Sequence, residues 1–179
     1  MIDPIFMSEE DIYLKPLSKK DISDEYYNAF NNFKLTQTNG HGIFPVDNIA
    51  SEETLEDMHA RKSIRLMIFL KETKKNIGVC SIQNIDLINR HAEIARFIWE
   101  ENIRGKGIGT QVLTALAMHC FNELNLKKIY LGNLSFNIAA IKSAQKIGFK
   151  EDGVLRKHHY KHGKYHDVIL SSLLSDEFE

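Results

Sequence analysis

Three glycines separated by single residues lie near the middle of the chain, at a change in apolar periodicity. They are Gly105, Gly107 and Gly109, with Arg104 and Lys106 beside them. Glycine lets a backbone approach a ligand closely and adopt conformations that other residues avoid. A helix that begins after such a turn presents N–H groups without internal partners at the positive end of its dipole. The sequence therefore predicts a seat for a phosphate or diphosphate group.

The segments on either side predict a strand that leads into this turn and a helix that follows it. Residues 93–99 alternate at first and are then mostly apolar, which is typical of a mostly buried strand. Apolar residues recur at helical spacing from Ile108 to Leu124. Two common phosphate loops do not fit. A Walker loop needs Ser or Thr where Gly107 follows Lys106, and the dinucleotide fingerprint needs a different glycine spacing.

The other periodic segments predict an alternation of strands and helices. Expected strands are 12–17, 64–70, 77–82, 128–131, 149–161 and 164–174. Expected helices run from Ser18 to Phe33, from Ser51 onward, and over 138–147. Asn137 and Gly148 are the capping signals of the last helix. Residues 35–50 have little periodicity, as in a binding loop. The order predicts an α/β (α+β) protein with a mixed sheet and helices on both faces.

Composition favours an ordinary globular domain. The 179 residues are 43% hydrophobic and 26% charged, without a linker or repeat, so we expect residues 1–179 to form one domain. A net charge of −1 predicts neither a nucleic-acid partner nor an anionic membrane partner. No apolar run approaches the roughly 20 residues of a membrane span. The start lacks a signal-peptide pattern, and Cys80 and Cys120 show no disulfide or metal spacing, so we expect a cytoplasmic protein.

Two motifs resemble those of the GCN5-related N-acetyltransferase (GNAT) superfamily. The glycine turn is similar to the family's acyl-CoA loop, R/Q-x-x-G-x-G/A, with Arg104, Gly107 and Gly109 in the defined positions. A later segment is similar to the family pattern N-x-x-A-I…K-x-G-F, with Asn137, Ala140 and Lys146 among its members. Residues 151–168 resemble the branch of RimJ/RimL-type ribosomal-protein, spermidine and amino-sugar acetyltransferases.

The resemblance implies a GNAT-like acyl-CoA N-acyltransferase fold with a mostly antiparallel central sheet. It also implies transfer of an acetyl group from acetyl-CoA to a primary amine, without a metal. A backbone N–H near Ile98 is expected to polarise the thioester carbonyl. The CoA contacts that it implies are Phe97, Ile98, Trp99, Arg104, Gly105, Lys106, Gly107, Ile108, Gly109, Thr110, Asn137, Ala140 and Lys146.

The proton-transfer groups are less clear from the sequence. Glu93 resembles the position of the glutamate base in histone-type members, and the alternative is a surface ion pair with Arg96 or Arg90. Many family members place an acidic tyrosine seven residues after the asparagine, where this chain has Ala144. Tyr130 and Tyr165, on neighbouring strands, are candidate acids, and water is another.

The acceptor amine stays open. His41 and Phe44 lie in the irregular segment that covers the acceptor site in the family, so we expect them near substrate. The acceptors that the RimJ/RimL-like resemblance favours are a protein N-terminal alanine or serine, or a small amine. A polyamine would need an acidic lining such as Glu52, Glu53, Glu56 and Asp57, and an amino-sugar nucleotide would need basic groups such as Arg90, Lys157 or Lys161. A non-catalytic acyl-CoA-binding module and a homodimer also stay open.

Overall fold

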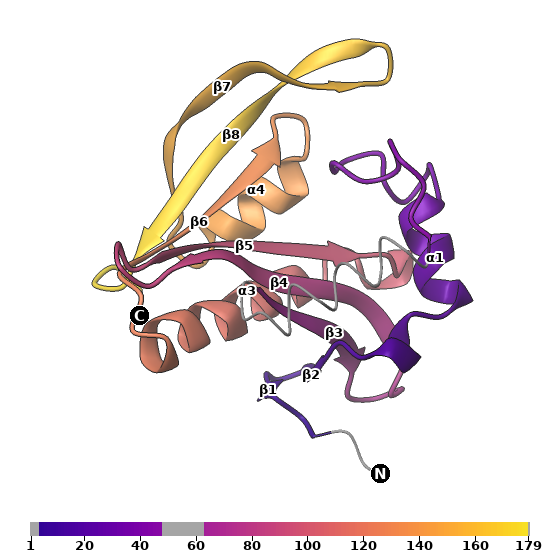
Figure 1. Cartoon of the computed structure of the whole chain (residues 1–179), viewed down its shortest axis with the longest axis horizontal. Helices are drawn as coiled ribbons and strands as arrows, with labels where there is room; N and C mark the ends of the chain where they lie inside the picture. The colour runs from indigo at the N-terminus through magenta and orange to yellow at the C-terminus, as the bar shows by residue number, and fades with distance from the viewer. Residues whose placement is uncertain (1–3, 48–62, 179) are drawn as a thin grey trace.

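A computed structural model describes residues 4–47 and 63–178, and one eight-stranded sheet forms the centre of this part of the chain (Figure 1). Neighbouring strands follow the order β1-β2-β3-β4-β5-β6-β8-β7. The strands are β1 Met7–Ser8, β2 Ile12–Pro16, β3 Ile64–Leu70, β4 Asn76–Asp86, β5 His91–Ile98, β6 Lys128–Leu134, β7 Lys150–Lys161 and β8 Lys164–Leu174. Every neighbouring pair is antiparallel except β5 and β6, which are parallel. The predicted mixed, mostly antiparallel sheet is confirmed.

The parallel pair stays together for a short distance only. Its register joins His91, Ala92 and Glu93 of β5 to Lys128, Ile129 and Tyr130 of β6. Beyond these pairs β5 remains beside β4 while β6 remains beside β8, so the two strands diverge (Figure 1). This divergence opens a gap in the middle of the sheet, directly before the glycine turn.

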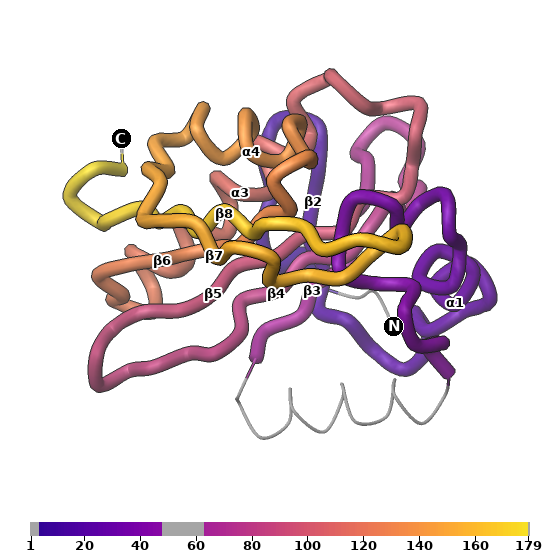
Figure 2. The backbone as a smooth tube through the Cα atoms, turned by 90° about the horizontal axis from the view of Figure 1, so that it is seen from above, coloured from indigo at the N-terminus to yellow at the C-terminus, as the bar shows by residue number. Residues whose placement is uncertain are grey.

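Helices cover both faces of the sheet. The α-helices of the described residues are α1 Asp24–Asn31, α3 Ile108–Met118 and α4 Ile138–Gln145, with short 3₁₀ turns at Lys19–Asp21 and Glu101–Ile103 and a π-turn at His119–Glu123. Helices α3 and α4 lie on one side of the central strands and α1 lies on the other (Figure 2). None of the helices in the described ranges is long and apolar enough to cross a membrane.

One predicted helix differs from the structure, and another lies outside the described residues. The helix expected from Ser18 begins later, at Asp24, because Ser18 starts a separate 3₁₀ turn. The Asp21 carboxylate accepts hydrogen bonds from the Ser18 N–H at 2.9 Å and from its hydroxyl at 2.6 Å, which closes that turn. The helix expected from Ser51 lies outside the described residues, as do the acidic side chains named with it.

Two apolar cores hold this architecture. The larger one lies between the sheet and α3 and α4, with Ile94 and Leu116 among its fully buried residues. The smaller one lies beneath α1 and contains Phe30, Phe97 and Trp99. Burying a large apolar side chain contributes about 1.5–3 kcal/mol, so both cores hold β5 firmly from its two faces. Residues of β5 therefore have fixed directions towards either face.

Candidate active site

The glycine turn is open to an incoming ligand. Gly105 and Gly107 have φ of 81° and 82°, in the left-handed region that favours glycine. A Cβ added at either residue would meet nothing within 4 Å. Gly107 is the N-cap of α3, so the N–H groups of Ile108 and Gly109 lie in the first turn, where a helix has no internal acceptors. The turn is therefore an open loop at a helix N-terminus, which is the geometry that the predicted diphosphate seat requires, and the Thr110 N–H donates to the Gly107 carbonyl at 2.9 Å.

The two cationic side chains of the turn lie in solvent. Lys106 is exposed, and so is Arg104. The Arg104 guanidinium lies 3.3 Å from the carboxylate of Glu101, which also binds Lys34 at 2.9 Å. Both are free to turn towards a ligand, because exposed ion pairs are weak.

A third cation lies beneath the turn. The side chain of Arg96, on β5, passes so close to α3 that a Cβ at Gly109 would lie 3.2 Å from Arg96 Nε. Its guanidinium donates to the Ala140 carbonyl at 3.3 Å and to the Ser143 hydroxyl, both on α4. Burial lowers the pKa of Arg96 to about 10, so the group stays charged near neutral pH. Arg96 thus adds positive charge where the gap between β5 and β6 meets α3.

The gap also receives a backbone donor from β5. The Trp99 N–H donates to the Ile77 carbonyl at 3.0 Å, which places the Trp99 amide on the β4 side. Successive residues of a strand direct their amides to opposite edges, so the Ile98 N–H faces the gap. Of Phe97, Ile98 and Trp99, Ile98 is the residue whose N–H points away from β4, although its Cα is paired with Gly78 of that strand. The Phe97 and Trp99 side chains lie on the α1 face.

Asn137 has two local partners at the start of α4. Its side-chain oxygen accepts from the Ala140 N–H at 3.2 Å, and its amide nitrogen donates to the Thr38 carbonyl at 2.9 Å. The predicted cap is confirmed, and the residue also ties α4 to the irregular segment. Lys146 lies at the other end of the helix and is exposed.

Glu93 and Tyr130 meet where β5 and β6 separate, since they form the last pair of the parallel register. The Glu93 carboxylate accepts from Asn84 Nδ2 at 2.8 Å, whereas Arg96 binds α4 and Arg90 binds Asn125. The alternative of an ion pair between Glu93 and either arginine is therefore wrong. Burial, followed by the charge of Glu93, raises the pKa of Tyr130 and keeps its hydroxyl protonated near neutral pH.

The family position for an acidic tyrosine is closed in this chain. Ala144 is 2% exposed and belongs to the larger core. Tyr165 is exposed, with its ring 5.0 Å from that of Tyr160 on the β7–β8 hairpin. Tyr130 is therefore the tyrosine that the described structure places beside Glu93.

A cavity of about 330 Å³ lies on the α1 face, over β3, β4 and β5. Its lining consists of Leu17, Tyr26, Phe30, His41, Val46, Arg65, Val79, Cys80, Ser81, Gln83, Ala95, Arg96 and Phe97. Gln83 is the β4 partner of Glu93, so the cavity ends beside the candidate base. Of the two predicted substrate contacts, His41 lines it. Phe44 is 82% exposed and does not, because the irregular segment places it on the outside.

The His41 ring packs against aromatic side chains, and two positive charges lie near it. Its ring centroid lies 4.7 Å from that of Phe30 and 5.5 Å from that of Phe97, although other parts of the residue remain exposed. Removal of the ring from water, and then the charges of Lys161 and Arg65, lower the pKa of His41 to about 4. The imidazole is therefore neutral at physiological pH.

Lys161 anchors the segment that carries His41. Its ammonium donates to the carbonyls of Thr36, Asn39 and His41, at 2.6, 2.8 and 2.7 Å. Lys161 is buried, and these three carbonyls occupy its donors, so it serves the loop rather than a substrate phosphate. Of the other basic residues named for such a phosphate, Lys157 is exposed and Arg90 binds Asn125.

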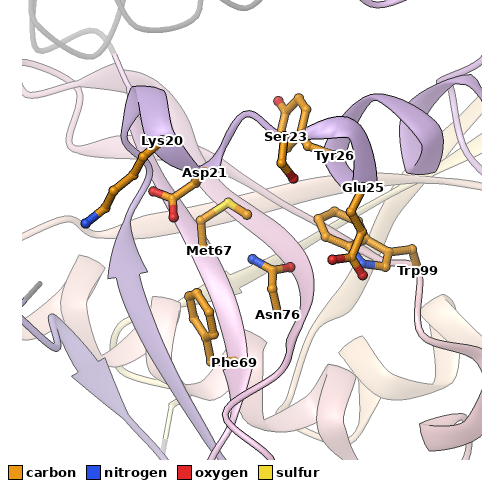
Figure 3. Close-up of a pocket in the computed structure, with 9 residues that line it drawn as sticks. All are labelled: Lys20, Asp21, Ser23, Glu25, Tyr26, Met67, Phe69, Asn76 and Trp99. Atoms are coloured by element: carbon orange, nitrogen blue, oxygen red, sulfur yellow. The ribbon is translucent and has the colours of Figure 1, made fainter.

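A smaller cavity of about 170 Å³ lies at the other end of α1 (Figure 3). Its lining consists of Lys20, Asp21, Ser23, Glu25, Tyr26, Met67, Phe69, Asn76 and Trp99. Tyr26 lines both cavities. The indole nitrogen of Trp99 is buried and has no hydrogen-bond partner within the described residues. The Trp99 side chain therefore faces this cavity rather than the glycine turn.

Several residues that line the larger cavity belong to none of the sequence motifs. Arg65 and Arg96 are the clearest, because Arg65 is a charged residue inside an otherwise apolar strand and Arg96 lies between apolar residues of β5. Arginine is rarely buried without a partner, so such a position is a signal for function or for a specific brace. The aromatic residues of α1 have no comparable signal, because helical spacing alone also predicts an ordinary core face.

Comparison with known proteins gives the class of this protein. A family model described as an acetyltransferase (GNAT) domain matches residues 11–150. The chain therefore belongs to the GNAT acetyltransferase family, as the sequence motifs predict. The glycine turn, the gap between β5 and β6 and the cavity beside it lie at the centre of this domain.

Named relatives show which members it is similar to. The chain is 36% identical over 102 residues to the putative ribosomal N-acetyltransferase YdaF of Bacillus subtilis, and the match covers 57% of this chain and 55% of that protein. It is 28% identical over 135 residues to the spermidine N(1)-acetyltransferase of Vibrio cholerae, with 75% and 78% covered. The chain thus spans little more than half the length of the first relative.

A solved structure shares the whole architecture. The spermidine N-acetyltransferase of Vibrio cholerae, in complex with CoA and spermine, superposes with a TM-score of 0.83 at 25% sequence identity. The superposition covers 93% of this chain and 97% of that one. That protein therefore binds CoA and an amine on the same fold.

Proposed function

We propose that this protein transfers the acetyl group of acetyl-CoA to a primary amine, and that residues 1–179 work as a single domain. The observation that carries the proposal is the divergence of β5 from β6 immediately before the open glycine turn. A ligand whose diphosphate is seated at the turn can extend through this gap to the cavity on the other face of the sheet. CoA has this shape, and it supplies a thioester as the acetyl donor.

Each part of the site then has a task. The N–H groups of Ile108 and Gly109 bind the diphosphate, together with Arg104 and Lys106. The Ile98 N–H lies at the gap and donates to the thioester carbonyl oxygen. A donor of this kind contributes about 3 kcal/mol to transition-state stabilisation.

Glu93 and Tyr130, at the end of the gap, transfer the protons in this proposal. Glu93 removes a proton from the acceptor ammonium, directly or through one water, and Asn84 fixes the carboxylate that does so. Tyr130 stays protonated beside it and can return a proton to the leaving thiolate. The acceptor enters from the cavity on the α1 face. It is a small amine or a protein N-terminal alanine or serine in this proposal, and the relatives include a putative ribosomal N-acetyltransferase and a spermidine N(1)-acetyltransferase.

The direct test combines calorimetry with CoA and turnover assays with amines. Replacing Gly107 with leucine places a side chain in the open space of the turn and should weaken CoA binding at least about tenfold. Gly163→Leu is a matched control, because Gly163 has a φ of 76°, has no atoms within 4 Å of an added Cβ and lies in the β7–β8 turn. Equal CoA affinity in the two variants would contradict the assignment of the turn.

A second candidate function is a non-catalytic acyl-CoA-binding module. The observation in its favour is Ala144, which occupies the position of the family's acidic tyrosine inside the core. Tight CoA binding without acetylation of amino acids, peptides, amino sugars or polyamines would establish this second function. Acetylation of any of them would establish the first.

A further inference from the structure

We propose that the acceptor is an amine that also carries a carboxylate or phosphate group, and that Arg65 binds this anion. The inference rests on the proposed function and specifies its substrate class. It starts from the large cavity on the α1 face, whose lining contains the charged side chain of Arg65. Arg96 also borders the cavity, but its guanidinium binds α4 on the other face of the sheet, and none of the described lining residues is an aspartate or glutamate.

Arg65 has unused binding capacity. Its Nε is buried and has no hydrogen-bond partner within the described residues. A guanidinium offers five N–H donors in a planar fork that matches a carboxylate or phosphate. A buried N–H donor without a partner is costly, so its retention in the wall of a cavity points to a ligand that supplies an acceptor, and an anion would also match the charge of the guanidinium.

The surroundings of Arg65 keep the cavity positive. The positive charge of Arg65 helps to lower the pKa of His41, so the imidazole is neutral at neutral pH and adds no charge to the cavity. Arg65 also faces Tyr26, whose pKa is raised by burial, so that side chain is neutral as well. The ammonium of Lys161 lies close by, behind the loop carbonyls that it binds. A polycation would meet repulsion here, whereas an anion would be attracted.

The position of Arg65 relative to Glu93 sets the size of the acceptor. Arg65, Ser81 and Ala95 form one row across β3, β4 and β5, and Glu93 lies one row further along β5 on the same face. Strand spacing and rise place the Cα atoms of Arg65 and Glu93 about 12 Å apart. The Arg65 and Glu93 side chains extend into the space between these Cα atoms, so the guanidinium and the carboxylate are closer together than the Cα atoms. An amine and an anion separated by a few bonds fit this span, as in an amino acid or an amino-sugar phosphate.

The smaller cavity does not alter this assignment. It contains the carboxylates Asp21 and Glu25, but Asp21 is held by Ser18 and Glu25 is exposed on α1. Tyr26 lines both cavities. The buried and unpartnered group in the larger cavity is a cation, so the larger cavity selects for the anion.

The experiment compares matched amines with and without the anion. Initial rates with saturating acetyl-CoA give kcat/KM for amino acids and their amides, for glucosamine and glucosamine 6-phosphate, and for spermidine. In the wild type, the anionic member of at least one pair should exceed its neutral partner at least tenfold, because a charge-assisted contact is being made. The pair that shows the difference identifies the source of the anion as carboxylate or phosphate.

Variants of Arg65 test the residue itself. Arg65→Gln should reduce kcat/KM for the anionic amine at least about tenfold and leave the neutral partner within threefold. Arg65→Lys should restore part of the loss. Arg156→Gln is the matched control, since Arg156 is an exposed arginine on β7. Unchanged CoA affinity, measured by calorimetry, shows that each variant is folded.

The outcomes separate the two proposals. Failure to bind CoA, or CoA binding without acetylation of any amine, refutes the enzyme and the inference together. Acetylation of neutral amines or spermidine as well as or better than anionic amines refutes the inference alone. Retention of the anion preference in Arg65→Gln also refutes it.

Discussion

The contact between Lys161 and the irregular segment gives the sharpest prediction about stability. Lys161→Met keeps the length and apolar stem of the side chain but removes the ammonium that binds the carbonyls of Thr36, Asn39 and His41. Thr36 is completely buried, so its carbonyl cannot easily find water in the variant. Asn39 and His41 are nearer the surface and can be hydrated.

The magnitude follows from this difference between the three carbonyls. A hydrogen bond to a charged group contributes about 1.5–3 kcal/mol, and a buried acceptor left without a partner costs about 1–3 kcal/mol. One full loss at Thr36 and two partial losses give a destabilisation of about 2–4 kcal/mol. The loop also carries His41 to the cavity, so KM for the acceptor should rise while CoA affinity stays unchanged.

Urea unfolding measures the first effect and steady-state kinetics measure the second. The unfolding midpoint should fall at constant slope, which reports a change in stability rather than in the extent of unfolding. Lys164→Met is the control, because Lys164 is an exposed lysine on the same hairpin. If Lys161→Met lowers stability by no more than this control, the three hydrogen bonds do not anchor the loop, and the reasoning fails.

Four other positions give further predictions. Glu93→Gln should lower kcat about 100-fold at pH 7 without changing CoA affinity, since general-base catalysis contributes 10²–10⁴-fold. Tyr130→Phe should also lower kcat if the Tyr130 hydroxyl is the acid. A normal rate in either variant would exclude the role of that residue. The pKa of His41 is about 4 in the folded protein, against the ordinary value of 6.5. Between these two pH values the folded state binds fewer protons than the unfolded state. The contribution of neutral His41 to stability is therefore full above pH 6.5 and is lost as the pH falls towards 4. Urea midpoints of His41→Gln should therefore depend less on pH across that window than those of the wild type. Gly78→Ala should destabilise the protein by about 1–3 kcal/mol, because its Cβ would collide with β5 backbone, whereas Gly153→Ala, with open space around it, should not.

The sequence predicted most of the elements because their signals are local. The β7–β8 hairpin turns at Gly163, and α4 is capped by Asn137, both as expected. The helix expected from Ser18 was wrong in its start, because Asp21 satisfies the Ser18 donors locally and closes a short turn. A pattern of apolar spacing does not reveal such competition between a side chain and the helix backbone.

The candidate site was predicted unevenly for a related reason. The glycine turn is contiguous in the chain, so its motif is visible in the sequence. The cavity is assembled from β3, β4, β5, α1, the irregular segment and Leu17, which follows β2, and only the fold brings these together. Phe44 and His41 illustrate the limit, since they lie three residues apart and point to different environments. Loop residues lack the periodicity that would assign them to one side.

The gap between β5 and β6 raises a problem of stability that Arg96 helps to solve. Strands that part lose the hydrogen bonds of their ladder, and their backbone groups then need other partners or a ligand. Arg96 spans this gap from β5 to the Ala140 carbonyl and Ser143 hydroxyl on α4, which follows β6 in the chain. The two walls of the gap are therefore connected by a side chain where the backbone cannot connect them. Because this brace passes beneath Gly109, it leaves the open side of the turn at Gly105 and Gly107 accessible. The same arginine can thus connect the two walls of the gap and place positive charge next to the proposed diphosphate seat, which gives a physical reason for a buried arginine between apolar residues of β5.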